Sequence, residues 1–244
     1  MHEPLALTRF LNELFGGTVL ALFHAVGFHP ANPAAPITDG FALELLVVVG
    51  LIAFFVLVRL TLSVEKPNPA QQIAEMIHEF TGSNGDQIIG HGYERFQAFV
   101  TCIFLFVLLN NLLGLIPGIV TPTSLPIIPL GIAVPTFIYY HYFGFKEQGF
   151  VGYMKHFAGP IWWIAWLLFP IEIISHFARI MSLTIRLYAN MFASDLVTLV
   201  FFSLFPLAIP AVFLGLHAAV SLIQAYVFML LAMIYLSQAV AHEH

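Results

Sequence analysis

The sequence predicts an all-α polytopic membrane protein with about five membrane helices, the last two long and steeply tilted as a hairpin. Hydrophobic residues make up 60% of the 244-residue chain and charged residues only 9%, whereas soluble domains carry about 25% charged residues. Five apolar segments are long enough to cross a hydrocarbon core of roughly 30 Å. The last two, about 160–204 and 207–239, are longer than a span at ordinary tilt requires.

Residues 1–40 are expected to form a periplasmic or interfacial segment ahead of the membrane domain. Between residues 5 and 28, Glu13 and His24 interrupt the apolar pattern, which favours a short amphipathic helix at the membrane surface. A signal peptide is the alternative, because Arg9 precedes an apolar stretch that small residues follow.

The membrane domain, residues 41–239, is expected to begin with three single spans. Prolines inside the third span predict an irregular start for it. A second amphipathic helix is expected at 70–80, between the first two spans. The three spans are placed at 41–62, 96–119 and about 126–145.

The long pair that follows is the most unusual feature of the hydropathy pattern. Residues 207–239 would make a helix of about 50 Å. Such a helix fits the membrane core only by tilting steeply, breaking or protruding. Three tryptophans are expected to mark where the first of the pair enters the interface: Trp162, Trp163 and Trp166.

Lysine and arginine predict how the chain is oriented. They flank or lie in the loops expected at about 63–95 and 145–159, and few lie in the first 40 residues. The positive-inside rule therefore places both loops in the cytoplasm and the N-terminus outside. Five crossings return the C-terminal tail, residues 240–244, to the cytoplasm.

Four charged side chains lie between residues 160 and 238: Glu172, Arg179, Arg186 and Asp195. An arginine at the centre of a membrane helix costs roughly 2.5–3.5 kcal/mol on insertion scales, so Arg186 marks a candidate functional site. Steps of four and three residues place a stripe of side chains about 27 Å long on one helix face. The stripe contains Glu172, His176, Arg179, Leu183, Arg186 and Asn190.

The second long segment carries its own polar stripe, His217, Ser221 and Gln224, which Tyr235 and Gln238 extend. Asp195 follows Arg186 by nine residues and therefore faces away from it. It is expected to line a separate aqueous pocket and to approach His217 across the hairpin. Together these groups form a candidate path for protons through the membrane.

Structural roles are the alternative for most of these side chains. Glu172, Arg179 and Asp195 are of the kind that pair or reach headgroups at helix ends. His176 fits a packed ring, and the uncharged members of the stripes fit hydrogen bonds between neighbouring helices. Arg186 fits a structural role least well, because the run around it is continuously apolar. The uncharged members are Asn190, Ser221 and Gln224.

Composition excludes several functions. A net charge of −5 without a basic patch argues against nucleic acid as a partner. The single cysteine, Cys102, makes neither an intramolecular disulfide nor a thiolate metal site. With no phosphate-binding loop pattern, we expect no nucleotide, cofactor or metal, and no catalytic site in this chain.

The chain contains three longer motifs: Ser182-Leu-Thr-Ile-Arg186-Leu-Tyr-Ala-Asn190-Met, then His217-Ala-Ala-Val-Ser-Leu-Ile-Gln224-Ala-Tyr-Val-Phe-Met, and Leu108-Leu-Asn-Asn-Leu-Leu-Gly-Leu-Ile-Pro117. Together they resemble the a-subunit family of F-type ATP synthases. The resemblance covers about residues 40–239. It implies a proton-translocating stator subunit in a bacterial inner membrane, where the other subunits are its partners. These are the rotating c-subunit ring, b-type peripheral stalk subunits and the rest of the synthase, and no homo-oligomer is implied.

The resemblance also implies roles for individual residues. Arg186 is the stator arginine that separates two offset half-channels to the ring. Glu172, with His176 one turn away, belongs to the cytoplasmic half-channel. The periplasmic half-channel is implied to contain Asn190, Asp195, His217 and Gln224.

The chain departs from the family pattern at two places. Residue 195 is aspartate where better-known bacterial members have glutamate. The stretch Ser124-Leu-Pro-Ile-Ile-Pro-Leu lacks the Asn or Asp that many members carry there. Two functions outside the family remain open at this point. One is a haem-binding redox subunit with His176 and His217 as axial ligands, and the other is a secondary transporter with a site at the midplane.

Overall fold

The computed structural model describes residues 4–25, 27, 32–33, 35–116, 118–158, 165–204 and 208–240. Within these residues the chain is helical, without strands, and forms seven α-helices and one 3₁₀ turn. In chain order they are α1 (Ala6–Ala25), α2 (Asp39–Leu60), α3 (Pro69–Ile88), α4 (Glu94–Leu113), η1 (Pro122–Ser124), α5 (Ile127–Ala158), α6 (Ala165–Leu204) and α7 (Ala208–Val240).

Five of these helices are long and apolar enough to cross a membrane: α2, α4, α5, α6 and α7. This confirms the predicted fold class. Helices α6 and α7 have 40 and 33 residues, which confirms the long hairpin. The remaining two, α1 and α3, are the predicted amphipathic helices, and α3 is longer than expected.

Some expected segments differ from the structure, and others lie outside the described residues. Residues 145–158, expected as part of a loop, continue as helix in α5. Of the expected tryptophan belt, Trp166 is exposed on α6, whereas Trp162 and Trp163 lie outside the described residues. The tail is described only as far as Val240, where α7 ends.

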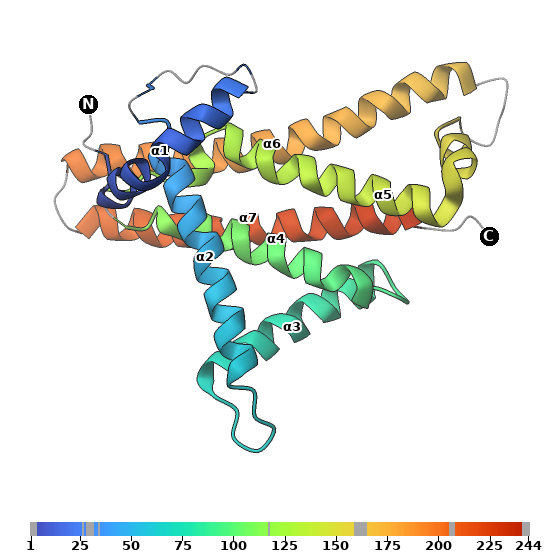
Figure 1. The fold of residues 1–244 in the computed structure, drawn as a ribbon. Coiled ribbons are helices and arrows are strands. Elements are labelled where there is room, and N and C mark those ends of the chain that lie inside the picture. The colour runs from blue at the N-terminus through green and yellow to red at the C-terminus, as the bar shows by residue number, and fades with distance from the viewer. Residues whose placement is uncertain are drawn as a thin grey trace.

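The helices run in two main directions (Figure 1). Helices α4, α5, α6 and α7 lie roughly lengthwise beside one another, with α5 packed against both α6 and α7. Helix α2 crosses this group steeply, and α3 leads back from the foot of α2 to the start of α4. The steep crossing matches the inclination that the lengths of α6 and α7 require.

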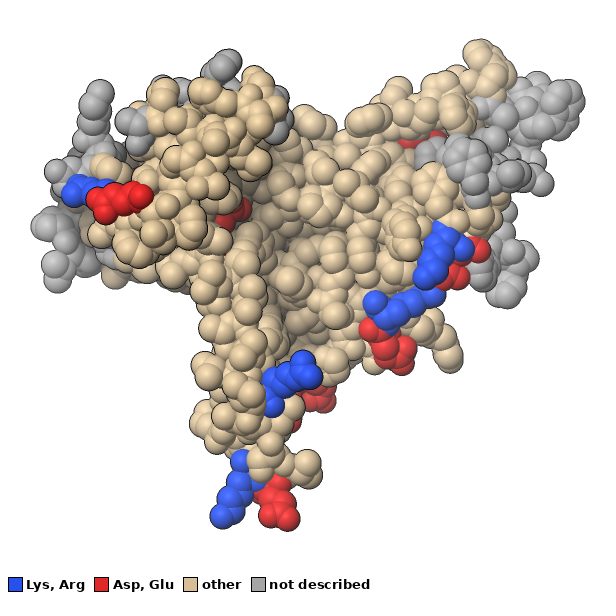
Figure 2. All heavy atoms as spheres, viewed as in Figure 1, with Lys and Arg blue, Asp and Glu red and all other residues tan. Residues whose placement is uncertain are grey.

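One continuous apolar core joins α4, α5, α6 and α7. Its most buried members are large side chains such as Phe96, Leu187, Met191, Phe228 and Met229. The outer faces are also apolar, as expected for lipid contact. On the face in Figure 2, Lys and Arg lie mainly at the foot of α2 and near the end of α5, and the middle is almost uncharged.

The backbone of α5 breaks at Gly149 rather than at its prolines. The irregularity expected at the start of this span is confined to η1 and the residues just after it, and the helix then passes through Pro135. Gly149 has φ +70° and ψ 163°, a region that essentially only glycine occupies.

Beyond this break, Tyr153 packs against Gly144, where an added Cβ would lie 2.5 Å from the Tyr153 ring. Burial raises the pKa of Tyr153 to about 12, so its phenol stays neutral.

We predict that Gly149→Ala destabilises the protein by about 1–3 kcal/mol, because alanine is strained in this backbone region. The control is Gly131→Ala in the same helix, where no atom lies within 4 Å of the added Cβ. That change is expected to stabilise slightly, since alanine is the better helix former. Thermal unfolding in detergent measures both variants, and equal melting temperatures would contradict the prediction.

Candidate functional site

Arg186 lies in the middle of α6 with its side chain exposed. Its guanidinium donates a hydrogen bond of 3.3 Å to Ser182 Oγ, one turn earlier on the helix. Among the described residues, no carboxylate lies within 4.0 Å of this guanidinium. A permanent positive charge therefore faces outward from an apolar helix with only a neutral partner.

The predicted stripe on α6 contains both buried and exposed side chains. His176 and Leu183 are buried, 8% and 3% exposed, whereas Arg186 and Asn190 are exposed. The stripe thus follows the boundary between the face packed on α5 and α7 and the open face. Residues at such a boundary touch the protein interior on one side and are accessible from outside on the other.

Asp195 sits beyond Arg186 on α6, in a cluster contributed by three helices and the link between α4 and η1. Its Oδ2 accepts a hydrogen bond of 3.1 Å from the Thr121 N–H, and its Oδ1 accepts one of 2.6 Å from the Thr121 hydroxyl. The same Oδ1 lies 3.7 Å from His217 Nδ1 on α7, as expected across the hairpin. We call these residues, with Ser194 and Asn111, the Asp195 cluster.

The contacts of His217 define its neutral tautomer. Its ring is 1% exposed, and Nε2 lies 3.2 Å from the carbonyl oxygen of Asn111. A carbonyl only accepts, so Nε2 carries the proton. Nδ1 then accepts from the Ser194 hydroxyl at 2.7 Å. The nitrogen that carries no proton, Nδ1, is therefore the one that lies near Asp195.

Asn111 on α4 ties this region together. Its Oδ1 accepts a hydrogen bond of 2.6 Å from Thr123 in η1, and its Nδ2 donates one of 3.5 Å to the Ser221 carbonyl on α7. These bonds hold α4, η1 and α7 in fixed positions, and in lipid few other partners exist for buried amides. Ser221 itself is fully buried, with its hydroxyl 4.0 Å from Met191 Sδ.

Asn190 and Gln224 lie between Arg186 and the Asp195 cluster. Asn190 Nδ2 donates a hydrogen bond of 2.9 Å to Gln224 Oε1, which joins α6 to α7. Gln224 is 4% exposed, while Asn190 is exposed. The pair therefore bonds neighbouring helices and also presents an amide beside Arg186.

A second cluster forms toward the start of α6. Glu172 Oε1 lies 3.4 Å from His176 Nε2 and 3.9 Å from Arg179 Nη2. The Tyr140 hydroxyl on α5 lies 2.9 Å from His176 Nδ1, and Arg179 stacks over the Tyr235 ring at 5.1 Å. We call these five residues the Glu172 cluster. They line a cavity of about 30 Å³ together with Tyr153, Gln238 and Ala239, enough space for a water molecule.

Sequence spacing missed several members of these clusters. Ser194 follows Asn190 by four residues, so one further step along the α6 stripe finds it. Asn111 and Tyr140 lie on other helices and Thr121 lies in the link before η1, so no periodicity within one helix connects them to Asp195 or His176.

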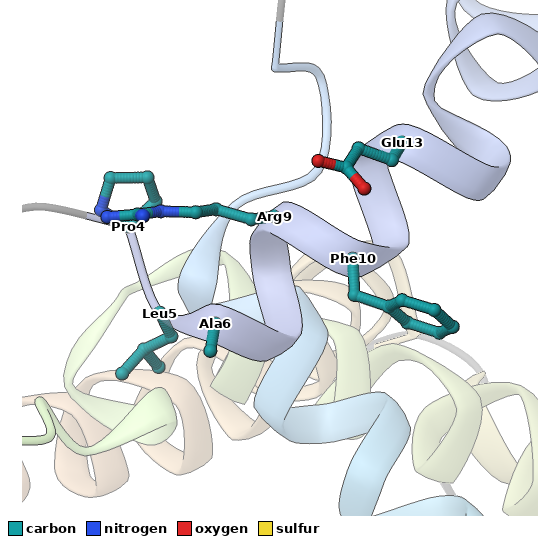
Figure 3. A pocket seen from close by; sticks show the side chains of 6 residues that line it. All are labelled: Pro4, Leu5, Ala6, Arg9, Phe10 and Glu13. Carbon is teal, nitrogen blue, oxygen red and sulfur yellow. The ribbon is translucent and has the colours of Figure 1, made fainter.

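A second, open hollow lies at the start of α1, lined by Pro4, Leu5, Ala6, Arg9, Phe10 and Glu13 (Figure 3). It contains none of the residues that the stripes contribute. Within the described residues, no three His, Cys, Asp or Glu side chains are grouped as metal ligands.

Comparison with known proteins identifies the family. Residues 42–237 match the family model described as ATP synthase A chain. The chain is 51% identical to ATP synthase subunit a of Koribacter versatilis over 244 residues, all of both proteins. It is 43% identical to that of Solibacter usitatus over 233 residues, 96% of this chain and 99% of the relative. It is 37% identical to that of a Geobacter species over the full length of both. With its five long apolar helices and the exposed Arg186 between two polar clusters, the chain belongs to the ATP synthase A chain family.

Proposed function

We propose that this chain is the stator through which protons cross the membrane sector of a bacterial rotary ATP synthase. The observation that carries the proposal is the isolation of Arg186. It lies exposed between the Asp195 cluster and the Glu172 cluster, without a carboxylate partner in the described chain. A charge in this position fits an external carboxylate that arrives, pairs and leaves.

In this mechanism the partner of Arg186 is a carboxylate on a rotating ring of c subunits. The guanidinium favours the ionised form of any carboxylate beside it. A ring site that reaches Arg186 therefore releases its proton before it passes. Because the charge of arginine is permanent, Arg186 also prevents protons from crossing directly between the two clusters.

The Asp195 cluster supplies the proton on the periplasmic side. A proton on the Asp195 carboxyl passes to His217 Nδ1, now 3.7 Å from Oδ1, once the two groups move into hydrogen-bond distance and the Ser194 hydroxyl turns away from Nδ1. The resulting imidazolium donates from both nitrogens. The Asn190–Gln224 pair and Ser221 then lie along the two helices between His217 and Arg186, as polar steps toward the ring carboxylate.

The Glu172 cluster receives the proton on the cytoplasmic side. The Glu172 carboxylate contacts both His176 and Arg179, and the adjoining cavity has room for a water molecule. A carboxylate, an imidazole and a water within reach of one another are the components of a proton relay. Each proton that crosses contributes about 2.3 kcal/mol per 100 mV of membrane potential.

Orientation and partners complete the proposal. The N-terminus is periplasmic and the C-terminus cytoplasmic, following the basic residues near the ends of α2 and α5. The chain contacts the c ring through the Arg186 face, and b-type stalk subunits hold it still. A haem-binding role is not favoured, because both nitrogens of the His217 ring already contact protein groups.

We predict that Arg186→Ala abolishes ATP-driven proton pumping, because a neutral stator no longer forces the ring carboxylate to ionise. The measurement is quenching of a pH-sensitive dye in inverted membrane vesicles. The control is Arg59→Ala, an exposed arginine at the end of α2, which is expected to pump normally. Full pumping by the Arg186 variant would overturn the proposed function.

We predict that Asp195→Asn lowers pumping on the order of 100-fold, as expected when a positioned acid–base group is removed. Asp195→Glu keeps a carboxylate and is expected to retain a larger share of the activity. The two variants are compared in the same vesicle assay at equal amounts of assembled complex. If the Asn variant pumped as well as the Glu variant, Asp195 would have no part in the relay.

A further inference from the structure

Thr121 makes the closest contacts to Asp195 and comes from a segment to which the sequence assigned no function. It lies in the link between α4 and α5 and is fully buried. Its backbone N–H and its hydroxyl bond one oxygen each of the same carboxylate, at 3.1 and 2.6 Å. Two donors from one residue fix both the position and the rotation of the carboxylate plane.

The link is shaped to hold Thr121 in this position. The Ser124 hydroxyl donates a hydrogen bond of 2.7 Å to the Thr121 carbonyl, and Pro122 follows as the first residue of η1. Gly114 supplies the space, because an added Cβ there would overlap the Thr121 hydroxyl and lie 2.9 Å from His217 Nε2. The Thr121 hydroxyl therefore occupies space that is available only because residue 114 is glycine.

We propose that Thr121 is the positioning residue of the periplasmic proton relay. It holds the Asp195 carboxylate so that Oδ1, the oxygen that accepts from the Thr121 hydroxyl, stays directed at His217 Nδ1 at 3.7 Å. Without the hydroxyl, rotation of the carboxyl group moves Oδ1 away from the imidazole. This inference rests on the proposed function, since it assigns Thr121 a part in that relay.

Two substitutions separate the effect of the Thr121 hydroxyl on pumping from the effect of its side-chain shape. Thr121→Val keeps the volume and the backbone N–H but removes the hydroxyl, whereas Thr121→Ser keeps the hydroxyl and removes a methyl group. A positioning role predicts that pumping falls about tenfold in Thr121→Val, by loss of a hydrogen bond to a charged group. It also predicts that Thr121→Ser retains at least about half of the activity. A purely packing role predicts the opposite order.

The experiment measures ATP-driven pumping in inverted vesicles of the complete synthase, normalised to the amount of subunit in the membrane. Thr136→Val is the matched control, because Thr136 is equally buried and its hydroxyl bonds only a carbonyl of its own helix, Ile132, at 2.8 Å. It is expected to pump normally. If Thr121→Val fails to assemble, Thr121→Ala replaces it in the comparison with Thr121→Ser.

Normal pumping by the Thr121 variant without a hydroxyl, or equal losses in both Thr121 variants, overturns the inference. The Arg186→Ala measurement keeps this outcome apart from failure of the proposed function. If the Arg186→Ala variant does not pump while the Thr121→Val variant does, only the positioning role of Thr121 is contradicted. If the Arg186→Ala variant pumps fully, the proposed stator function is contradicted.

Discussion

The separation of the Arg186 guanidinium from both acids of its own helix is the constraint on which the rest of the site depends. Glu172 is engaged by His176 and Arg179, and Asp195 is engaged by Thr121 and lies beside His217. Had either acid paired with Arg186, the pair would be a structural salt bridge, and its charge would be cancelled within the chain. Because Glu172 lies 14 residues from Arg186 and Asp195 faces the opposite side of the helix, the arginine remains available to an external anion.

Keeping the acids apart also explains why α6 must be long. Glu172 and Asp195 are 23 residues apart, about 35 Å along a helix at 1.5 Å per residue. A helix running straight across a core of roughly 30 Å would place one of them outside it. A steeply inclined helix instead brings both clusters and Arg186 within the height of the membrane. In Figure 1, α2 runs at a steep angle to α6, as this requirement predicts.

The sequence predicts the features that arise within one helix. Hydropathy predicts the five long apolar helices, and steps of three and four residues find Glu172, His176, Arg186 and Asn190 on α6. Apart from the expected approach of Asp195 to His217, contacts between elements escape this approach. Thr121 approaches Asp195 across 74 residues, and Tyr140 approaches His176 across 36. Single-helix periodicity carries no information on such pairs. The break in α5 was missed for a different reason. Hydropathy does not reveal that Gly149 adopts a positive φ. The prolines, which were expected to disturb this helix, are tolerated near its start.

The link just before the second departure from the family pattern contacts the residue that forms the first, Asp195. The chain has the shorter acid at 195, and the segment after α4 lacks the Asn or Asp that resembling proteins carry. A carboxylate one carbon shorter reaches less far from its helix, so its partners must come closer. The link does this: Gly114 removes the obstructing side chain, and η1 turns so that Thr121 meets both oxygens of Asp195. Thr121, three residues before that stretch, thus supplies a hydroxyl and a backbone amide to the Asp195 carboxylate.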